Sequence, residues 1–328
     1  MAVDPGLTSQ TITHDLLLKH ASSLTAESVM KPDPIGVSED VYDFTQADAL
    51  IAFAQASGIA VRGHCLVWHR TAPAWFFAGD QSDVAAYKAL VRQRLETYVT
   101  DVVTHFKGKV YCWDVVNEVV SDDASGDYRT SQWYQALGPD YIEYAFRAAH
   151  AADPGAQLFI NDYSTEYADK RGRLLNIVQD LLNKGVPVDG VGHQLHISIT
   201  STTATAVAAA LSDVEAKGLV NHVTELDVSI YADPASCSVS GTGCAAQIDP
   251  GSQAYNDALR AQALLYRSLY DLFATHASVE AVTTWGVADN HTWLDTTPVT
   301  RTNYPLLFDV SGNPKSAFWA VADPGFTP

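Results

Sequence analysis

The 328-residue sequence contains no apolar run near the roughly 18 residues that a membrane-spanning helix needs. Positive charge is also scarce, because 20 Lys and Arg face 38 Asp and Glu and leave a formal net charge of −18. A field of that sign repels phosphate backbones and anionic lipids, so neither nucleic acid nor a membrane is an expected partner. The apolar content of 47% nevertheless suffices for one large buried core, which excludes an intrinsically disordered chain.

The sequence also lacks the short motifs that mark several classes of enzyme. It has no Gly-x-Gly-x-x-Gly, no Walker loop, no His-Glu-x-x-His and no Gly-x-Ser-x-Gly. The segment that begins the first expected strand, Met1-Ala2-Val3-Asp4, carries no His-x-His either. We therefore expect no nucleotide cofactor, no metal ion and no serine nucleophile, and no other cofactor is implied.

Cysteine is sparse, and its four positions are of two kinds. Cys65 and Cys112 lie inside apolar runs and are expected to be buried thiols, whereas Cys237 and Cys244 bracket a segment of small residues. We expect the second pair to form a disulfide that closes a surface loop, with two free thiols as the alternative. Since disulfides persist in oxidising compartments, this pair favours a secreted protein. The first residues do not read as a secretory leader, so either the protein is cytoplasmic or a leader was trimmed, and the cysteine pair favours a trimmed N-terminus.

Short apolar runs alternate with amphipathic stretches along the whole chain, and no linker interrupts them. The runs predict these strands, the first of them partial: Met1–Asp4, Ser22–Met30, Ala60–Val67, Val110–Val116, Leu158–Asp162, Gly190–Ile197, Val223–Leu226 and Val282–Trp285. The stretches between them predict these helices: Ala47–Ser57, Val84–His105, Tyr141–Ala151, Arg171–Asn183, Ala204–Lys217 and Ala254–His276. The alternation predicts an α/β fold, a single (β/α)8 TIM barrel that spans residues 1–328 as one domain, with its active site at the C-terminal ends of the strands.

Polar and aromatic residues gather where the predicted strands end. Two of only nine glutamates, Glu118 and Glu225, end the fourth and seventh strands, which lie across the mouth of such a barrel. Hydrolysis of a sugar acetal needs two such carboxyl groups, one protonated to hand a proton to the leaving oxygen and one ionised. Neighbouring Trp and Tyr rings can stack on sugars, and amides can bind hydroxyls. The mixture predicts a carbohydrate cleft, and the spacing of the nearby histidines disfavours a metal site.

In order and spacing, six segments resemble those of glycoside hydrolase family ten, which consists mainly of endo-β-1,4-xylanases. The resemblance extends from about Glu27 to Trp319 and is carried by Gly63–His69, Trp113–Glu118, Asn161–Tyr163, Asp189–Gly192, Thr224–Asp227 and Trp285–Val287. It implies a retaining double displacement with Glu118 as general acid/base and Glu225 as nucleophile. It also implies that Asn117 holds the hydroxyl next to the reacting carbon, and that His196 hydrogen-bonds Glu225 with Asp227 behind it.

The resemblance further implies the residues that bind sugar. Glu27 matches a position in the next subsite toward the non-reducing end, and Tyr163 matches one on the leaving-group side. Six residues match positions at the cleaved bond: Lys31, His64, Trp68, Gln194, Trp285 and Trp293. Four others are interpreted as braces of the barrel mouth that do not touch sugar: Trp113, Asp114, Asn161 and Asp162.

Two positions depart from the family pattern. Ser28 and Thr71 stand where the family has an Asn and a Gln that hydrogen-bond the sugar one unit from the cleaved bond. Their side chains are shorter and lack an amide, so at about 1 kcal/mol per lost contact the affinity there falls by roughly one to two powers of ten. Arg70, beside Thr71, points to a different or charged sugar.

Three functions therefore compete. The first is a retaining endo-xylanase, and the second is the same chemistry on another β-linked glycan or glycoconjugate. The third is a sugar-binding protein without turnover, which the presence of both carboxylates, Asn117 and His196 disfavours. The expected partner is a polysaccharide or oligosaccharide, and the expected state is a secreted monomer.

Overall fold

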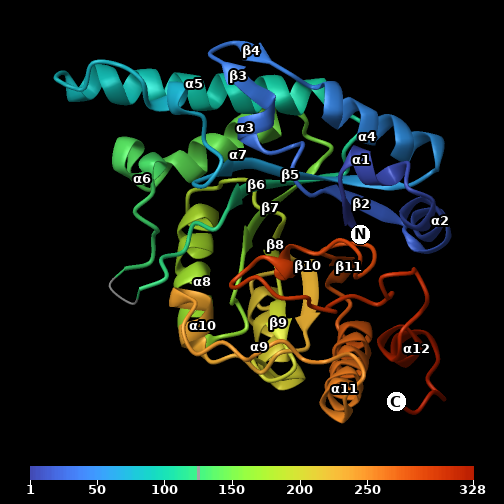
Figure 1. Cartoon of the computed structure of the whole chain (residues 1–328). Coiled ribbons are helices and arrows are strands. Elements are labelled where there is room, and N and C mark those ends of the chain that lie inside the picture. The colour runs from blue at the N-terminus through green and yellow to red at the C-terminus, as the bar shows by residue number, and fades with distance from the viewer. Residues whose placement is uncertain (124–125) are drawn as a thin grey trace.

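The computed structural model describes residues 1–123 and 126–328 (Figure 1). Within them, eight strands follow one another in chain order around one curled sheet, and each pairs in parallel with the next. They are β1 (Ala2–Val3), β2 (Ser23–Ala26), β5 (Ala60–Trp68), β6 (Cys112–Asn117), β7 (Gln157–Asp162), β8 (Gly190–His193), β10 (Val220–Ser229) and β11 (Val279–Thr284). The predicted (β/α)8 barrel is confirmed.

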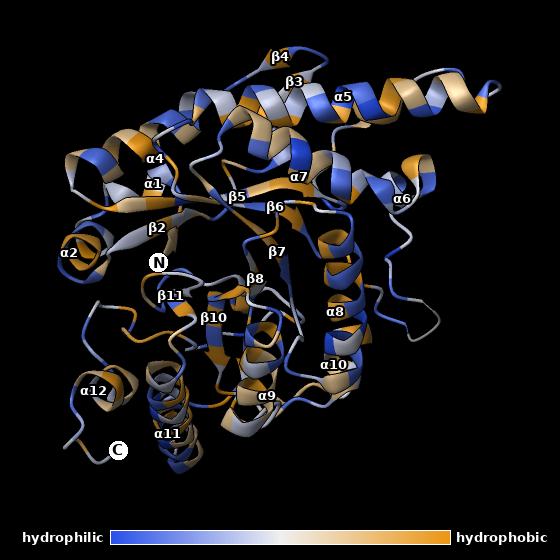
Figure 2. Ribbon diagram, turned by 180° about the vertical axis from the view of Figure 1, so that it is seen from behind, coloured by the Kyte–Doolittle hydropathy of each residue, from blue (hydrophilic) through white to orange (hydrophobic). Residues whose placement is uncertain are grey.

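Helices surround this sheet, and Figure 2 shows both hydrophilic and hydrophobic residues along α5 and α11, as expected of helices with one buried face. The longer ones are α2 (Thr11–His20), α4 (Thr45–Ala56), α5 (Val84–His105), α7 (Asp140–Ala152), α8 (Ala168–Asn183), α9 (Ala204–Glu215) and α11 (Gln253–Thr275). Short helices are α1 (Pro5–Thr8), α3 (Pro32–Ile35), α6 (Gln132–Leu137), α10 (Ala235–Ser240) and α12 (Ser316–Ala322). Among the described residues, none of the helices combines the length and the apolar character that crossing a bilayer requires.

Helix α5 illustrates how the sequence encodes its own element. Asp83 caps the helix, because its carboxylate accepts hydrogen bonds from the backbone N–H groups of Ala85 and Ala86. Along the helix the buried residues recur every three or four positions and pack into the core: Val91, Leu95, Tyr98, Val99, Val102 and Val103. The predicted range Val84–His105 is confirmed for that reason.

Two of the predicted strands are longer than the strands in the structure. The range Gly190–Ile197 is not continuous, because β8 ends at His193 and a separate strand, β9 (His196–Ser198), follows. Leu195 between them has a left-handed φ of 54°, which breaks the extended backbone. The break re-registers the chain so that His196 pairs with Asp227 on β10. The predicted strand Ser22–Met30 is also too long, since β2 stops at Ala26.

Several elements of the structure were not predicted from the sequence. Helix α2 was not predicted, because it begins with a Thr-Ile-Thr run whose β-branched residues favour strands. The small hairpin of β3 (Gly36–Ser38) and β4 (Val41–Tyr42) was not predicted either. The disulfide Cys237–Cys244 is confirmed, and Cys65 and Cys112 are buried and free, as expected.

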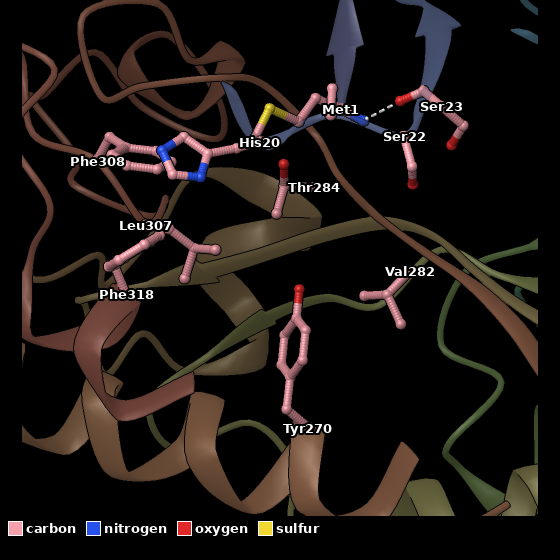
Figure 3. A pocket seen from close by; sticks show the side chains of 11 residues that line it. Met1, His20, Ser22, Ser23, Tyr270, Val282, Thr284, Leu307, Phe308 and Phe318 are labelled. Carbon is pink, nitrogen blue, oxygen red and sulfur yellow. Dashed lines mark hydrogen bonds between the residues drawn. The ribbon is translucent and has the colours of Figure 1, made fainter. Parts of the chain in front are cut away.

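A cavity of about 170 Å³ lies between the two ends of the sheet (Figure 3). Met1 and Ser23 line one side, and Val282, Thr284 and Phe318 line the other. Within residues 1–123 and 126–328, no ladder of hydrogen bonds joins β1 to β11. This cavity is lined by none of the polar residues that follow the strand ends, so it lies apart from the predicted cleft.

We predict that Gly63→Ala destabilises the barrel. A Cβ at Gly63 on β5 would lie 2.2 Å from the ring of Trp113, its buried partner on β6. Relief of this clash must move a packed indole, which costs about 1–3 kcal/mol in the free energy of unfolding. The matched control is Gly172→Ala on α8, where no atom lies within 4 Å and the helix gains about 0.5–1 kcal/mol. Denaturant unfolding measures both, and equal effects would contradict the packing argument.

Candidate active site

Glu225 lies on β10 and is held by two neighbours. Its Oε1 accepts a hydrogen bond of 2.7 Å from Asn161 Nδ2 on β7, and its Oε2 lies 3.1 Å from His196 Nε2 on β9. The residue Glu225 is 4% exposed. Burial alone would raise the pKa of Glu225, but the hydrogen bond from His196 and the nearby charge of His64 outweigh it and hold that pKa below its usual value. Glu225 is therefore built to be ionised.

His196 connects Glu225 to a second carboxylate. Its Nδ1 lies 2.8 Å from Asp227 Oδ2, which also accepts a hydrogen bond of 2.8 Å from Trp293 Nε1. Burial would lower the pKa of His196, but the charges and hydrogen bonds of Asp227 and Glu225 raise it to about 10. The imidazole is therefore a cation at neutral pH, donating one hydrogen bond to each carboxylate.

Glu118 follows β6 directly and has different surroundings. Gln194 Nε2 lies 3.3 Å from its Oε1, and His69 Nδ1 lies 3.9 Å from its Oε2. Burial, together with the charges of Arg129 and Arg70, lowers the pKa of His69 to about 4, so this ring is neutral at pH 7. No cation donates a hydrogen bond to the Glu118 carboxyl from within residues 1–123 and 126–328, in contrast to Glu225.

A chain of amide groups joins the two glutamates. Asn161 donates to both Glu225 and Asn117, and Gln194 donates to both Asn117 and Glu118. The two bonds to Asn117 end on its Oδ1, at 2.9 and 3.2 Å, so the amide is oriented with its Nδ2 away from both donors. The parallel register of β6, β7 and β10 brings these residues to one edge of the sheet.

A second buried network lies behind the glutamates. His64 Nδ1 is 2.9 Å from Asp114 Oδ2, and Asp114 also accepts hydrogen bonds from the guanidinium of Arg62. Arg62 in turn donates a hydrogen bond of 2.6 Å to Nδ1 of His222. Burial and the charge of Arg62 lower the pKa of His222 to about 3. Burial would raise the pKa of Asp114, but Arg62 and His64 lower it to about 2. These contacts place Asp114 between Arg62 and His64, and they fix the orientation of the His64 ring.

Aromatic and cationic side chains form a wall beside His64. Lys31 Nζ lies 4.8 Å from the ring centroid of Trp68 and 5.8 Å from that of Trp285. The Trp285 ring also packs edge-on against His64, at 5.3 Å between centroids. Farther along, Glu27 Oε2 lies 3.2 Å from His291 Nε2. The structure thus brings Lys31, Trp68, Trp285 and His64 together, as the resemblance implied.

Tyr163 is connected to Glu118 through the side chain of Arg129. Its hydroxyl contacts Asp122 and accepts a hydrogen bond of 2.8 Å from Arg129, and Lys170 Nζ lies 3.2 Å from its ring centroid. Arg129 and Lys170 were not singled out from the sequence, because they stand in a loop and on a helix with no strand end to mark them. Asn161, which was interpreted as a brace of the barrel mouth, hydrogen-bonds Glu225 directly.

The two departures from the family pattern, and Arg70 beside one of them, have distinct surroundings. Ser28 is exposed, and its Oγ hydrogen-bonds Asp4, which also accepts the Ser28 backbone N–H at 3.0 Å. The Oγ1 of Thr71 and the Nε1 of Trp68 are buried and have no hydrogen-bond partner among the described residues. Arg70 is exposed at the rim. The side chain of Ser28 is therefore engaged within the protein, whereas the buried polar atoms of Thr71 and Trp68 are not.

The chain is similar to known proteins over almost its whole length. The sequence model of Glycosyl hydrolase family 10 matches residues 1–324. An endo-1,4-beta-xylanase of Geobacillus stearothermophilus is 39% identical over 312 residues, which are 94% of this chain and 90% of the relative. The crystal structure of xylanase B from Clostridium stercorarium F9 has a TM-score of 0.91 and 39% identity, and covers 98% of this chain and 95% of its own. A mutant structure in complex with xylotriose has a TM-score of 0.89 and 34% identity, covering 98% of this chain and 95% of its own.

We predict that Asp227→Asn lowers the pKa of His196 markedly from about 10, since it removes the larger of the two attractive charges. The folded-state pKa lies above 6.5, so the stabilisation from these contacts is complete below pH 6.5 and is lost as the pH rises toward 10. Histidine ring resonances in an NMR titration report the change. Asp213→Asn, which alters an exposed pair with Arg171, is the control. A wild-type His196 that deprotonates near pH 6.5 would contradict the assignment.

Proposed function

The chain belongs to Glycosyl hydrolase family 10, and from that membership and the geometry of its two glutamates we propose that it is a retaining endo-β-1,4-xylanase. The observation that carries the proposal is the contrast between the carboxyl of Glu225, bonded to a histidine cation, and that of Glu118, bonded to a neutral amide. A retaining glycosidase needs this contrast, because one carboxyl must attack as an anion while the other gives up a proton.

In the first step, Glu118 donates its proton to the glycosidic oxygen while Glu225 attacks the anomeric carbon. The bond to the leaving sugar breaks, its oxygen carries the proton away, and a covalent glycosyl-enzyme forms on Glu225. His196 and Asn161, each bonded to one oxygen of Glu225, hold the carboxylate in the direction of attack. Asn117, whose Oδ1 is already occupied, presents Nδ2 to the hydroxyl next to the reacting carbon.

In the second step, a water molecule replaces the leaving sugar. Glu118, now an anion, takes a proton from this water as its oxygen attacks the anomeric carbon, and the bond to Glu225 breaks. The negative charge returns to Glu225 beside the His196 cation, and Glu118 regains its proton. Two inversions at the anomeric carbon leave its configuration unchanged.

Binding of the sugar chain rests on the walls of the same cleft. Lys31, His64 and Gln194 supply hydrogen-bond donors near the cleaved bond, and Trp68, Trp285 and Trp293 supply flat faces for the apolar C–H surfaces of xylose. Glu27 extends this surface toward the non-reducing end, and Tyr163 contributes the leaving-group side.

The proposal predicts activity on xylan that depends on both glutamates. Wild-type protein should release xylo-oligosaccharides from xylan and arabinoxylan but not from mannan or galactan, as measured by mass spectrometry. Glu225→Ala should abolish release, and Glu118→Ala should lower its rate by about 10²–10⁴-fold. Glu280→Ala, on β11 at the opposite end of the barrel, is the matched control and should keep full activity. Silence on xylan with cleavage of another glycan would contradict the xylanase proposal.

A second candidate function keeps the chemistry and changes the sugar. The observation in its favour is the altered subsite, where Ser28 is engaged by Asp4 and Thr71 leaves its hydroxyl without a protein partner among the described residues. A glycan other than xylan, or a charged sugar that pairs with the exposed Arg70, would satisfy those groups in a different way. On this reading the catalytic pair is unchanged, and the neighbouring subsite selects the substrate.

Thr71→Gln discriminates between the two. If the substrate is xylan, the restored amide adds about one hydrogen bond to the neighbouring sugar and lowers KM for xylotriose by roughly fivefold, since one bond contributes about 1 kcal/mol. Thr202→Gln, at another buried hydroxyl without a partner, controls for the added bulk. Steady-state kinetics measure both variants. A KM that rises in Thr71→Gln alone, with unchanged kcat, would favour the altered-specificity candidate.

We also propose that the protein works outside the cell as a monomer. The disulfide Cys237–Cys244 supports an oxidising compartment, and a polymeric substrate is met outside the cell. Fractionation of the native host and light scattering of the purified protein test these two points separately.

A further inference from the structure

Glu118 has an unusual backbone. Its φ is 59°, in the left-handed region that residues other than glycine seldom occupy and that costs free energy to hold. Two hydrogen bonds fix this conformation. The Glu118 N–H donates to the carbonyl of Asn161 at 2.8 Å, and the Glu118 carbonyl accepts from Nε of Arg129 at 2.8 Å. The peptide groups on both sides of Glu118 are therefore held, and with them the direction in which its side chain leaves the backbone.

Arg129 uses the rest of its guanidinium on the leaving-group side. Nη1 donates to Asp122 Oδ2 at 2.8 Å, and Nη2 donates to the hydroxyl of Tyr163 at 2.8 Å. Its own backbone N–H donates to the carbonyl of Val119 at 2.7 Å, which ties the residue to the strand end. Because a guanidinium is rigid and planar, these contacts join the backbone of Glu118 to Tyr163 through a single group.

Neighbouring charges keep this arrangement in place. Lys170 Nζ lies 3.3 Å from Asp122 Oδ1 and 3.0 Å from Asp162 Oδ1, and Asp162 Oδ2 accepts the N–H of Val120 at 3.0 Å. Partial burial would raise the pKa of Asp122, but the hydrogen bonds of Arg129 and Tyr163 and the charge of Lys170 hold it well below its usual range. Asp122 is thus an anion at every pH at which Glu118 acts, so Arg129 retains its partner.

We propose that Arg129 is a positioning residue for acid/base catalysis: it sets the direction of the Glu118 carboxyl and couples that direction to the sugar held at Tyr163. The inference rests on the proposed function, in which Glu118 protonates the leaving oxygen. Arg129 has no contact with Glu225 in the structure, so it acts on proton transfer and not on nucleophilic attack.

The consequence is a dependence on the leaving group. Dinitrophenolate leaves without a proton, whereas phenolate needs protonation by the acid. Misplacement of Glu118 therefore slows formation of the glycosyl-enzyme only for the phenyl substrate. Because Glu118 also acts as base toward water, its misplacement slows breakdown of the glycosyl-enzyme for both substrates. Azide, which attacks the anomeric carbon without a base, bypasses that second defect.

The test compares Arg129→Met and Arg129→Lys with wild type on phenyl and dinitrophenyl β-xylobiosides. For Arg129→Met, kcat/KM on the phenyl substrate should fall by about 10–100-fold, a part of what an acid catalyst contributes, with kcat/KM on the dinitrophenyl substrate unchanged. On the dinitrophenyl substrate, kcat and KM should fall together, and azide should restore kcat. Arg129→Lys keeps the charge and should recover part of the loss.

Arg173→Met is the matched control. Arg173 of α8 anchors the same loop by donating to the carbonyls of Ser121, at 2.9 Å, and Asp123, but does not contact Glu118 or Tyr163. Arg173→Met should leave kcat/KM unchanged on both substrates. If Arg129→Met lowered kcat/KM equally on the two substrates, the inference would be overturned and the role of Arg129 would be merely structural. The same conclusion would follow if Arg173→Met also lowered kcat/KM on the phenyl substrate alone. An inactive wild type would contradict the proposed function, whereas an unchanged Arg129→Met beside an active wild type would overturn only this inference.

Discussion

A histidine cation held between two buried carboxylates is the interaction on which the site depends. His196 can keep its proton out of water because Asp227 and Glu225 each lie within hydrogen-bond distance of one ring nitrogen. In return, the cation lets Glu225 stay ionised despite its burial. Without it, desolvation would push Glu225 toward the neutral acid, and the two glutamates would compete for the same role. Asymmetry between the glutamates is thus a product of their neighbours and not of their residue type.

The barrel supplies the positions that this asymmetry requires. Glu118 and Glu225 are more than 100 residues apart in sequence, yet parallel pairing from β6 to β10 places the ends of both strands at one edge. Close contacts along the sheet, such as that of Gly63 with the Trp113 ring, leave little freedom for the strands to shift. The strand register sets the positions of the two glutamates. The hydrogen bonds among Asn161, Asn117 and Gln194 then orient their side chains.

Much of this could be predicted from the sequence because the signals are local. The apolar runs and helix periods predict the barrel, and the segment of small residues between Cys237 and Cys244 predicts the disulfide. Polar residues at the predicted strand ends indicate that Glu118 and Glu225 come together, as the amide hydrogen bonds between them show. The point at which a strand breaks depends on long-range pairing, so the division of Gly190–Ile197 could not be predicted: the left-handed φ of Leu195 accompanies the pairing of His196 with Asp227 on another strand.

Arg129 illustrates a second limit. Arg129 lies in an irregular segment with no periodicity. Its proposed role depends on three hydrogen bonds, to the carbonyl of Glu118, the carboxylate of Asp122 and the hydroxyl of Tyr163. Propensity and spacing carry no information about such a meeting of groups. Ser28 and Thr71 are the opposite case, since the sequence shows that they depart from the family, while only the structure shows that one is engaged by Asp4 and the other is unpartnered among the described residues.

The most direct measurement of the central claim is chemical trapping of the intermediate. A 2-deoxy-2-fluoro-β-xylobioside with a good leaving group slows breakdown of a glycosyl-enzyme, so intact mass spectrometry should show one added fluoroxylobiosyl group, and peptide mapping should place it on Glu225. The same reagent should leave Glu225→Ala unlabelled. A label on any other residue, or fast hydrolysis of ordinary xylobiosides with inversion and no trapped species, would contradict the account.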